Sequence, residues 1–222
     1  VDAYSILTNG TDRFGTPYPI FFQGFGLYGQ SLTVYLQVPF IKLFGLNEFA
    51  VRLTTACISL FGVAAVYVLI RLIFKMDSAW LTFAVFALSP VWFLHSRTGF
   101  EYIVAGSFFV AFGVFYILTF TRHWVFVIPA AVCGVATFYA HTTGRGWIAI
   151  ACVLLFFLNL RAHLRYWKRL LLGLMVFTLL LGPYLYLQWY HPEITMKRLE
   201  SLNFAEFKSK TLPQQIQHIL HN

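Results

Sequence analysis

Long apolar runs separated by short polar connections dominate the chain between Phe49 and Trp189. A bilayer core about 30 Å thick needs about 20 helical residues to cross it, and most of the runs reach or approach that length. The pattern therefore predicts an all-α, polytopic integral membrane protein with about six spanning helices. The runs cover residues 49–74, 78–95, 102–121, 124–140, 147–160 and 170–189.

The first 48 residues follow a different pattern. Turn signals at Asn9-Gly10 and Phe14–Pro17 lead into an aromatic-rich stretch that ends at Tyr28 and suits the headgroup region. Ser31–Phe44 is apolar, but a helix of about 14 residues extends for only about 21 Å, too short to cross a bilayer. We therefore expect a juxtamembrane helix at this point, on the exterior surface.

Three regions follow from these patterns. Residues 1–48 form an exterior loop with a juxtamembrane helix, and residues 49–189 form the transmembrane bundle. Residues 190–222 are polar and mixed in charge, so we expect them to begin a second exterior segment with short amphipathic pieces.

Lysine and arginine residues are distributed unevenly over the connections between the runs. Two connections hold one arginine each, Arg97 and Arg145, whereas three alternate connections are rich in basic residues. Because basic loops remain in the cytoplasm, we expect the rich connections to be cytoplasmic and the 96–101 and 141–146 connections to face the exterior of the cell membrane. The rich connections contain Arg71, Lys75, Arg122, Arg161, Arg165, Lys168 and Arg169.

Composition agrees with a membrane protein. Hydrophobic residues make up 59% of the chain and charged residues 11%, compared with about 25% charged in soluble domains. The net charge of +8 does not indicate a nucleic-acid partner, because the basic residues gather in alternate connections rather than on one surface. The three cysteines lie within apolar runs without metal-ligand spacing, so we expect no disulfide, no metal site and no cofactor.

Candidate chemistry lies in the two connections predicted to be exterior. Arg97 and Glu101 are four residues apart and would share a face if the turn between them were helical. Ionisable residues at the membrane boundary are costly and are functional candidates, although a simple ion pair between two helix ends is an equally good interpretation. His141 and Arg145 lie on the same side of the membrane, where an arginine can also be merely solvated.

Six motifs follow one another along the chain: Val1–Leu7, Asp12–Gly15, Phe21–Gly26, Val38–Leu53, Ser89-Pro90 and Ser96–Glu101. In this order they resemble the motifs of the bacterial GT-C glycosyltransferases of the protein O-mannosyltransferase-like class, family 39 and its relatives. The resemblance runs from residue 1 to about residue 150, and its most specific part is Leu43–Leu53.

The resemblance implies a partial GT-C fold and an integral membrane enzyme. Such an enzyme transfers a sugar from a polyprenyl-phosphate carrier, with inversion, to a lipid, glycan or protein acceptor on the exterior face. Glu101 matches an acidic position of the family, where it would orient the acceptor hydroxyl or assist the base. Arg97 and Arg145, together with His141, would bind the carrier, since its phosphate needs a fixed cation as it leaves.

Two departures from the family pattern concern the first exterior loop. Tyr28 and Gln30 stand where many relatives have a Lys-Pro-Pro or His-Pro-Pro element, so Gln30 could bind substrate only through hydrogen bonds. The family's Asp-Glu pair would fall a few residues before Val1. We therefore expect this chain to be a fragment that is inactive alone.

Two other classes of protein remain open. A transporter or flippase would use midplane charges and broken helices, but no acidic residue lies in the middle of a run, and the breaks are at Pro90, Pro129 and Pro183. A non-catalytic membrane scaffold is the second alternative, since a fragment without its catalytic acid would behave as one.

Overall fold

The protein is described by a computed structural model that covers the backbone of residues 1–24 and 27–190 and the side chains of residues 1–22 and 31–190. The exterior segment expected from residue 191 onward lies outside the described residues. Helices make up nearly all of the described chain. They are α1 (Asp2–Asn9), α2 (Leu32–Phe44), α3 (Glu48–Val68), α4 (Leu81–Leu88), α5 (Pro90–Arg97), α6 (Glu101–Thr121), α7 (Val127–Ala140), α8 (Thr142–Leu158), α9 (Leu160–Arg165) and α10 (Trp167–Tyr190).

Three helices in the described part of the chain are long and apolar enough to cross a membrane: α3 with its π-helical extension to Ile73, α6 and α10. A bent pair, Asp77–Leu88 and Pro90–Arg97, makes a fourth if it counts as one span. These helices support a multi-pass membrane protein. The remaining two predicted spans form apolar helices of 17 residues each, Trp124–Ala140 and Thr142–Leu158.

The predicted run 78–95 is bent, because α4 and α5 meet at an angle of 69°. Pro90 has no N–H to donate into α4, and its ring forces the preceding residue out of the helical region. Ser89 is accordingly extended, with φ −73° and ψ 112°, and Pro90 starts α5. Pro129 interrupts nothing, since it lies in the first turn of α7, where a helix tolerates proline.

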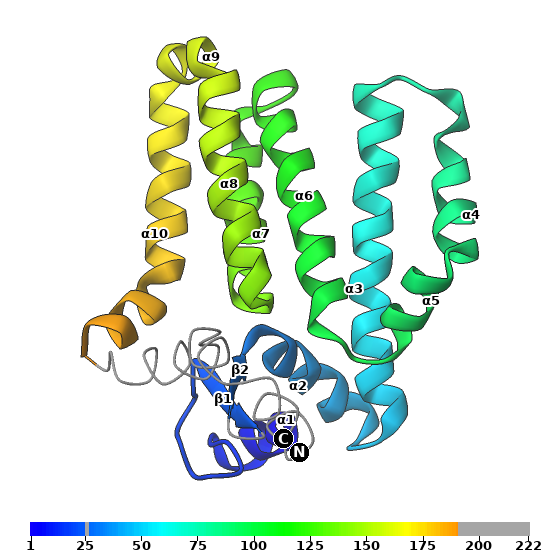
Figure 1. Ribbon diagram of the computed structural model, residues 1–222, viewed down its shortest axis with the longest axis vertical. Coiled ribbons are helices and arrows are strands. Elements are labelled where there is room, and N and C mark those ends of the chain that lie inside the picture. Colours follow the sequence, from blue (N-terminus) through cyan, green and yellow to red (C-terminus); the bar gives the residue numbers. More distant parts are fainter. Residues whose placement is uncertain (25–26, 191–222) are drawn as a thin grey trace, which may run out of the picture.

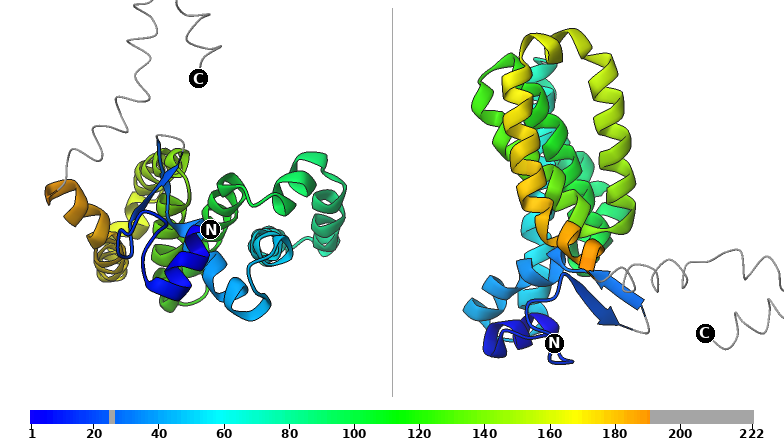
Figure 2. Two further views of the ribbon diagram at one scale, coloured as in Figure 1. Left: turned by 90° about the horizontal axis from the view of Figure 1, so that it is seen from below. Right: turned by 90° about the vertical axis from the view of Figure 1, so that its left-hand side faces the viewer.

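The connections alternate between two ends of the helix bundle (Figure 1). The connections around 71–77, 122–123 and 160–169 lie together at one end, which we call the basic end. Residues 1–48 lie across the opposite end with the starts of α6 and α8, and we call this the site end (Figure 2). The alternation of basic and nearly neutral connections in the sequence thus corresponds to two ends of one bundle.

Helix α6 is at the centre of the bundle. Its buried residues Ala111, Phe112 and Leu118 pack against α3, α7 and α8 in one apolar cluster. Helices α3 and α6 approach closely where Gly62 faces Ser107: a Cβ at Gly62 would lie 2.6 Å from the Ser107 hydroxyl. Small side chains at this crossing let the two backbones come together, as is common between membrane helices.

The N-terminal segment is more ordered than the expected loop. Asp12 is buried and its Oδ1 accepts hydrogen bonds from the backbone N–H groups of Phe14 (2.9 Å) and Thr16 (2.8 Å), which fixes the turn after α1. Helix α1 packs on α2 and α3 through Ala3, Ile41 and Ala50. Helix α2 confirms the predicted helix at 31–44.

A β-hairpin that the sequence analysis did not predict follows the turn. Strands β1 (Phe21–Gly24) and β2 (Leu27–Gln30) pair antiparallel, with Phe21 opposite Gln30. Tyr35 of α2 holds residues 19–22 against this helix. Its hydroxyl donates a hydrogen bond to the Pro19 carbonyl (2.9 Å), and its ring packs edge-on against the Phe22 ring. Burial, with a smaller effect of Tyr18 and Asp12, raises the pKa of Tyr35 to about 12.

Candidate functional site

The turn between α5 and α6 separates the two residues expected to act as a pair. Gly99 adopts φ +75°, a left-handed conformation that glycine takes without strain, and Phe100 is extended before α6 begins at Glu101. The condition for a shared helical face is therefore not met. Arg97 is exposed and its guanidinium lies 3.9 Å from the centre of the Phe93 ring, within its own helix α5.

Glu101 lies at the first position of α6, where the positive end of the helix dipole favours a carboxylate. It is half-buried and is not without interaction partners. The next residue, Tyr102, packs against His141, with ring centroids 4.0 Å apart. The starts of α6 and α8 are thereby held side by side, so Glu101, the residue before Tyr102, lies at the same end of the bundle as His141.

His141 is the N-cap of α8 and is fixed by its neighbour. Its Nδ1 accepts the backbone N–H of Thr143 at 3.1 Å and lies 2.8 Å from the Thr143 hydroxyl. Because a backbone N–H can only donate, Nδ1 carries no proton, so the neutral ring is protonated at Nε2. His141 therefore presents an N–H donor away from the helix it caps.

Arg145 lies one turn into α8 and is enclosed by aromatic rings. Its guanidinium carbon is 5.4 Å from the ring centre of Phe21, 4.8 Å from that of Phe138 and 4.8 Å from that of Tyr184. These rings come from β1, α7 and α10, so a single cation connects the hairpin to three helices. Stacking on rings uses the faces of the guanidinium and directs its N–H donors into the plane between them.

The Tyr184 ring is positioned by an unusual contact in α10. Pro183 lies within this helix, and the Tyr139 hydroxyl of α7 is inserted beside it. The hydroxyl accepts the Tyr184 backbone N–H (3.1 Å) and donates to the Leu180 carbonyl (3.4 Å), which are the two groups that an uninterrupted helix would pair. A side chain of the neighbouring helix α7 thus satisfies the backbone of α10 at its proline.

Tyr28 and Gln30 belong to β2, whose side chains are outside the described part of the structure. The backbone register places Gln30 opposite Phe21, whose ring contacts Arg145. The hairpin therefore brings the backbone of Gln30 to the same end as Arg145. Of the predicted site residues, His141 contacts Tyr102, the neighbour of Glu101, while Arg145 is enclosed by rings of other elements and Arg97 lies over a ring of its own helix α5.

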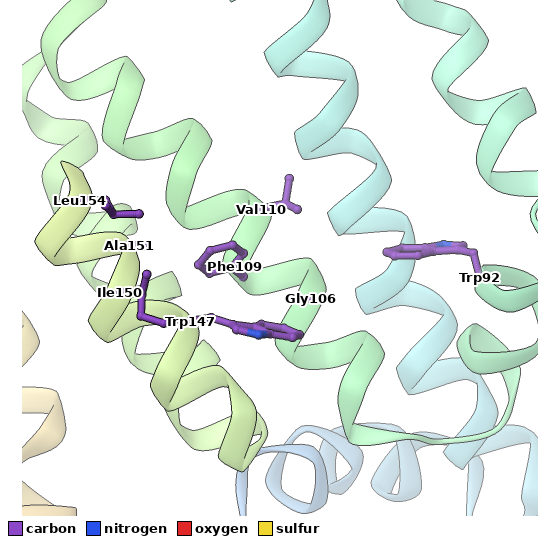
Figure 3. A pocket seen from close by; sticks show the side chains of 8 residues that line it. All are labelled: Trp92, Gly106, Phe109, Val110, Trp147, Ile150, Ala151 and Leu154. Carbon is purple, nitrogen blue, oxygen red and sulfur yellow. The ribbon is translucent and has the colours of Figure 1, made fainter. Parts of the chain in front are cut away.

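An apolar groove of about 460 Å³ lies between α6 and α8 (Figure 3). Its lining residues nearest the site end are Trp147, two residues after Arg145, and Gly106, five residues after Glu101. The groove extends from these residues toward the basic end. This groove was not predicted from the sequence; its signal there was Gly106, the sixth residue of α6, which leaves open space among the large side chains of Phe109 and Trp147. It is lined by Trp92, Gly106, Phe109, Val110, Trp147, Ile150, Ala151 and Leu154.

No protein-family model matches the chain, and no curated protein or solved structure shows significant similarity to it.

Proposed function

We propose that this protein transfers a sugar from a polyprenyl-phosphate carrier to an acceptor on the exterior face of the cell membrane. The observation that carries the proposal is the apolar groove between α6 and α8, which runs toward the starts of these two helices, where Glu101, His141 and Arg145 lie. A polyprenyl-phosphate sugar has the same order of parts: a long apolar chain, then a phosphate, then a sugar. The resemblance to GT-C glycosyltransferases supports the same assignment.

The groove suits a section of an apolar chain. Its volume lies within the range of about 300–1,000 Å³ that ligand pockets occupy, and its lining is almost wholly apolar. A chain in this groove would place its phosphate near the starts of α6 and α8. Arg145 supplies a cation at that end, held against Phe21, Phe138 and Tyr184 on the side of α8 that faces α7 and α10, and the His141 Nε2–H supplies a hydrogen-bond donor.

The chemistry requires an acceptor hydroxyl to attack the anomeric carbon while the bond from that carbon to the phosphate oxygen breaks. The bonding electrons leave with the phosphate, whose developing charge Arg145 compensates. The hydroxyl proton passes to a carboxylate, and Glu101 orients the hydroxyl or assists in accepting that proton. Arg97 adds positive charge at this end of the bundle, although its guanidinium lies over the Phe93 ring of its own helix, α5.

The proposal includes six crossings of the membrane, by α3, the α4–α5 pair, α6, α7, α8 and α10. Helices of 17 residues extend for about 25 Å, so Trp124–Ala140 and Thr142–Leu158 would cross with little shortfall. The basic end then lies in the cytoplasm and the site end at the exterior.

Substitution of Glu101 tests the chemical step. Measured in membranes, Glu101→Gln should lower the rate of sugar transfer from a polyprenyl-phosphate hexose by about 100-fold or more, because the amide cannot accept the proton. Glu48→Gln is a matched control, since Glu48 also starts a long helix but is exposed and paired with Arg52. Equal transfer rates in the two variants would mean that Glu101 stabilises the start of α6 and takes no part in the transfer reaction.

Filling the groove tests the carrier site. A Cβ at Gly106 or at Gly113 meets nothing within 4 Å, and only Gly106 lines the groove. Gly106→Leu should raise KM for the carrier about tenfold, whereas Gly113→Leu, two turns further along α6, should leave KM nearly unchanged. Unchanged KM in both variants would place the carrier chain elsewhere, and binding of the carrier without transfer would favour a flippase.

A further inference from the structure

Helix α9 lies at the basic end between α8 and α10, and its rotation is fixed by one buried histidine (Figure 1). His163 is 5% exposed, and its Nε2 lies 2.9 Å from the Tyr116 hydroxyl of α6. The Phe120 and Phe156 rings pack against its ring. Because His163 points into the bundle, the opposite sides of α9 must point away from it.

The outward sides of α9 carry two adjacent strips of different character. Leu160 and Leu164 are four residues apart and share one side, with Leu164 69% exposed. Arg161 and Arg165 share the neighbouring side, and both are exposed. An apolar strip beside a basic strip is the pattern of a helix that lies in the membrane interface.

The first turn of α10 continues this surface. Trp167 is 57% exposed, and the ammonium of Lys168, also exposed, lies 5.9 Å from its ring centre. Arg169 is used differently, since its guanidinium donates to the Thr119 carbonyl at 3.3 Å and lies over the Tyr166 ring. Arg169 therefore anchors α10 to α6, and the outward cations are Arg161, Arg165 and Lys168, which we call the basic shelf.

Carboxylates do not offset the charge of the basic shelf within the described part of the chain. Four of the five described acidic residues, Asp2, Asp12, Glu48 and Glu101, belong to the site end. The fifth, Asp77, is paired with Arg71 in the connection after α3. The electrostatic potential at the shelf is therefore positive.

We propose that the basic shelf binds the headgroups of anionic phospholipids in the leaflet at the basic end. The exposed leucines and Trp167 would enter the boundary of the acyl chains, while Arg161, Arg165 and Lys168 contact lipid phosphates. Three cations without a carboxylate favour a headgroup with a net negative charge over a zwitterionic one, which brings its own cation. This inference does not depend on the proposed transferase activity.

Fluorescence of Trp167 provides a test at the site itself. The protein is reconstituted in phosphatidylcholine nanodiscs with increasing fractions of brominated phosphatidylglycerol, and the Trp167 signal is the difference between wild type and Trp167→Phe. A parallel titration uses brominated phosphatidylcholine. Brominated phosphatidylglycerol should quench the Trp167 signal at about one tenth of the mole fraction that brominated phosphatidylcholine requires. Equal quenching by the two lipids would overturn the proposal.

Substitutions separate a local site from the overall charge of the basic end. Arg161→Gln with Arg165→Gln should weaken phosphatidylglycerol quenching about tenfold. Arg161→Lys with Arg165→Lys, which keeps the charge, should stay within about threefold of wild type. Arg71→Gln with Lys75→Gln removes the same number of cations from another connection and should change it less than twofold; a loss equal to that of the α9 pair would show that no local site exists.

Discussion

Arginine residues at the two ends of the bundle are in opposite environments. Arg145, at the site end, is half-buried among three rings from three elements. Arg165, at the basic end, is exposed, with a single ring contact at 5.5 Å to the adjacent Tyr166. A count of basic residues per connection treats the two alike, yet one cation holds several elements together and the other is directed outward.

The comparison shows that number and placement of charge have separate roles. At the basic end the exposed cations act together, which on our proposals sets the orientation in the membrane and binds anionic lipid. At the site end a single cation, that of Arg145, is enclosed by rings, and the enclosure fixes its position.

Labelling of introduced cysteines has an all-or-none outcome. Thr143 and Leu164 are exposed at the site end and the basic end, respectively. In a background without Cys57, Cys133 and Cys152, a membrane-impermeant thiol reagent added outside should label Thr143→Cys but not Leu164→Cys. The opposite labelling would invert the orientation, and labelling of both would mean that the two ends are not on opposite sides of the membrane.

Gly144→Ala should have the largest effect on stability. A Cβ there would lie 2.3 Å from the Thr137 carbonyl oxygen, so the turn that positions His141 and Arg145 must move. We expect a loss of about 3 kcal/mol in the free energy of unfolding, measured by chemical unfolding in micelles. Gly146→Ala, with nothing within 4 Å, is the control and should not destabilise. Equal stability of the two variants would contradict the close α7–α8 packing.

Arg145→Lys should have an intermediate effect. Lysine keeps the charge but loses the planar group that stacks between Phe21, Phe138 and Tyr184, at a cost of about 1–2 kcal/mol. Arg165→Lys at the basic end should change the free energy of unfolding by less than about 0.5 kcal/mol. If both substitutions have the same effect in thermal or chemical unfolding, the enclosure does not stabilise the protein.

The smallest effect concerns pH. Burial of His163, which lies in α9 outside the spanning helices, lowers its pKa. The unfolded chain then binds protons more readily than the folded one, so stability falls as pH drops below about 6.5, the value of an unperturbed histidine. His163→Phe should reduce the fall in Tm between pH 7.5 and pH 5.5. An unchanged fall would assign the pH dependence to other histidines.

The sequence predicted the elements whose structure depends on apolar length. The runs at 49–74, 102–121 and 170–189 became α3, α6 and α10 within a few residues, because a spanning helix satisfies its own backbone. The helix at Ser31–Phe44 followed from the same reasoning about length. The grouping of alternate connections at opposite ends was also predictable from Arg71, Arg122 and Arg161.

Features that depend on contacts between distant residues could not be predicted. The hairpin register of Phe21 with Gln30 and the insertion of Tyr139 at Pro183 have no local pattern. The enclosure of Arg145 requires Phe21, Phe138 and Tyr184 to meet, although they are separated by up to about 160 residues in the chain. The turn at Gly99, which separates Arg97 from Glu101, could by contrast be predicted from the local sequence, since glycine between two helices favours a turn.

The bend between α4 and α5 has a consequence for the surrounding lipid. If α4 and α5 form one span, residues 77–88 rise by about 18 Å and α5, turned by 69°, adds about 4 Å along the same direction, so the span would be about 8 Å shorter than a typical bilayer core. Such hydrophobic mismatch is met by local thinning, at fractions of a kcal/mol per Å. Trp92 on α5 also lines the groove, so thinning of the bilayer at this pair would occur beside the groove.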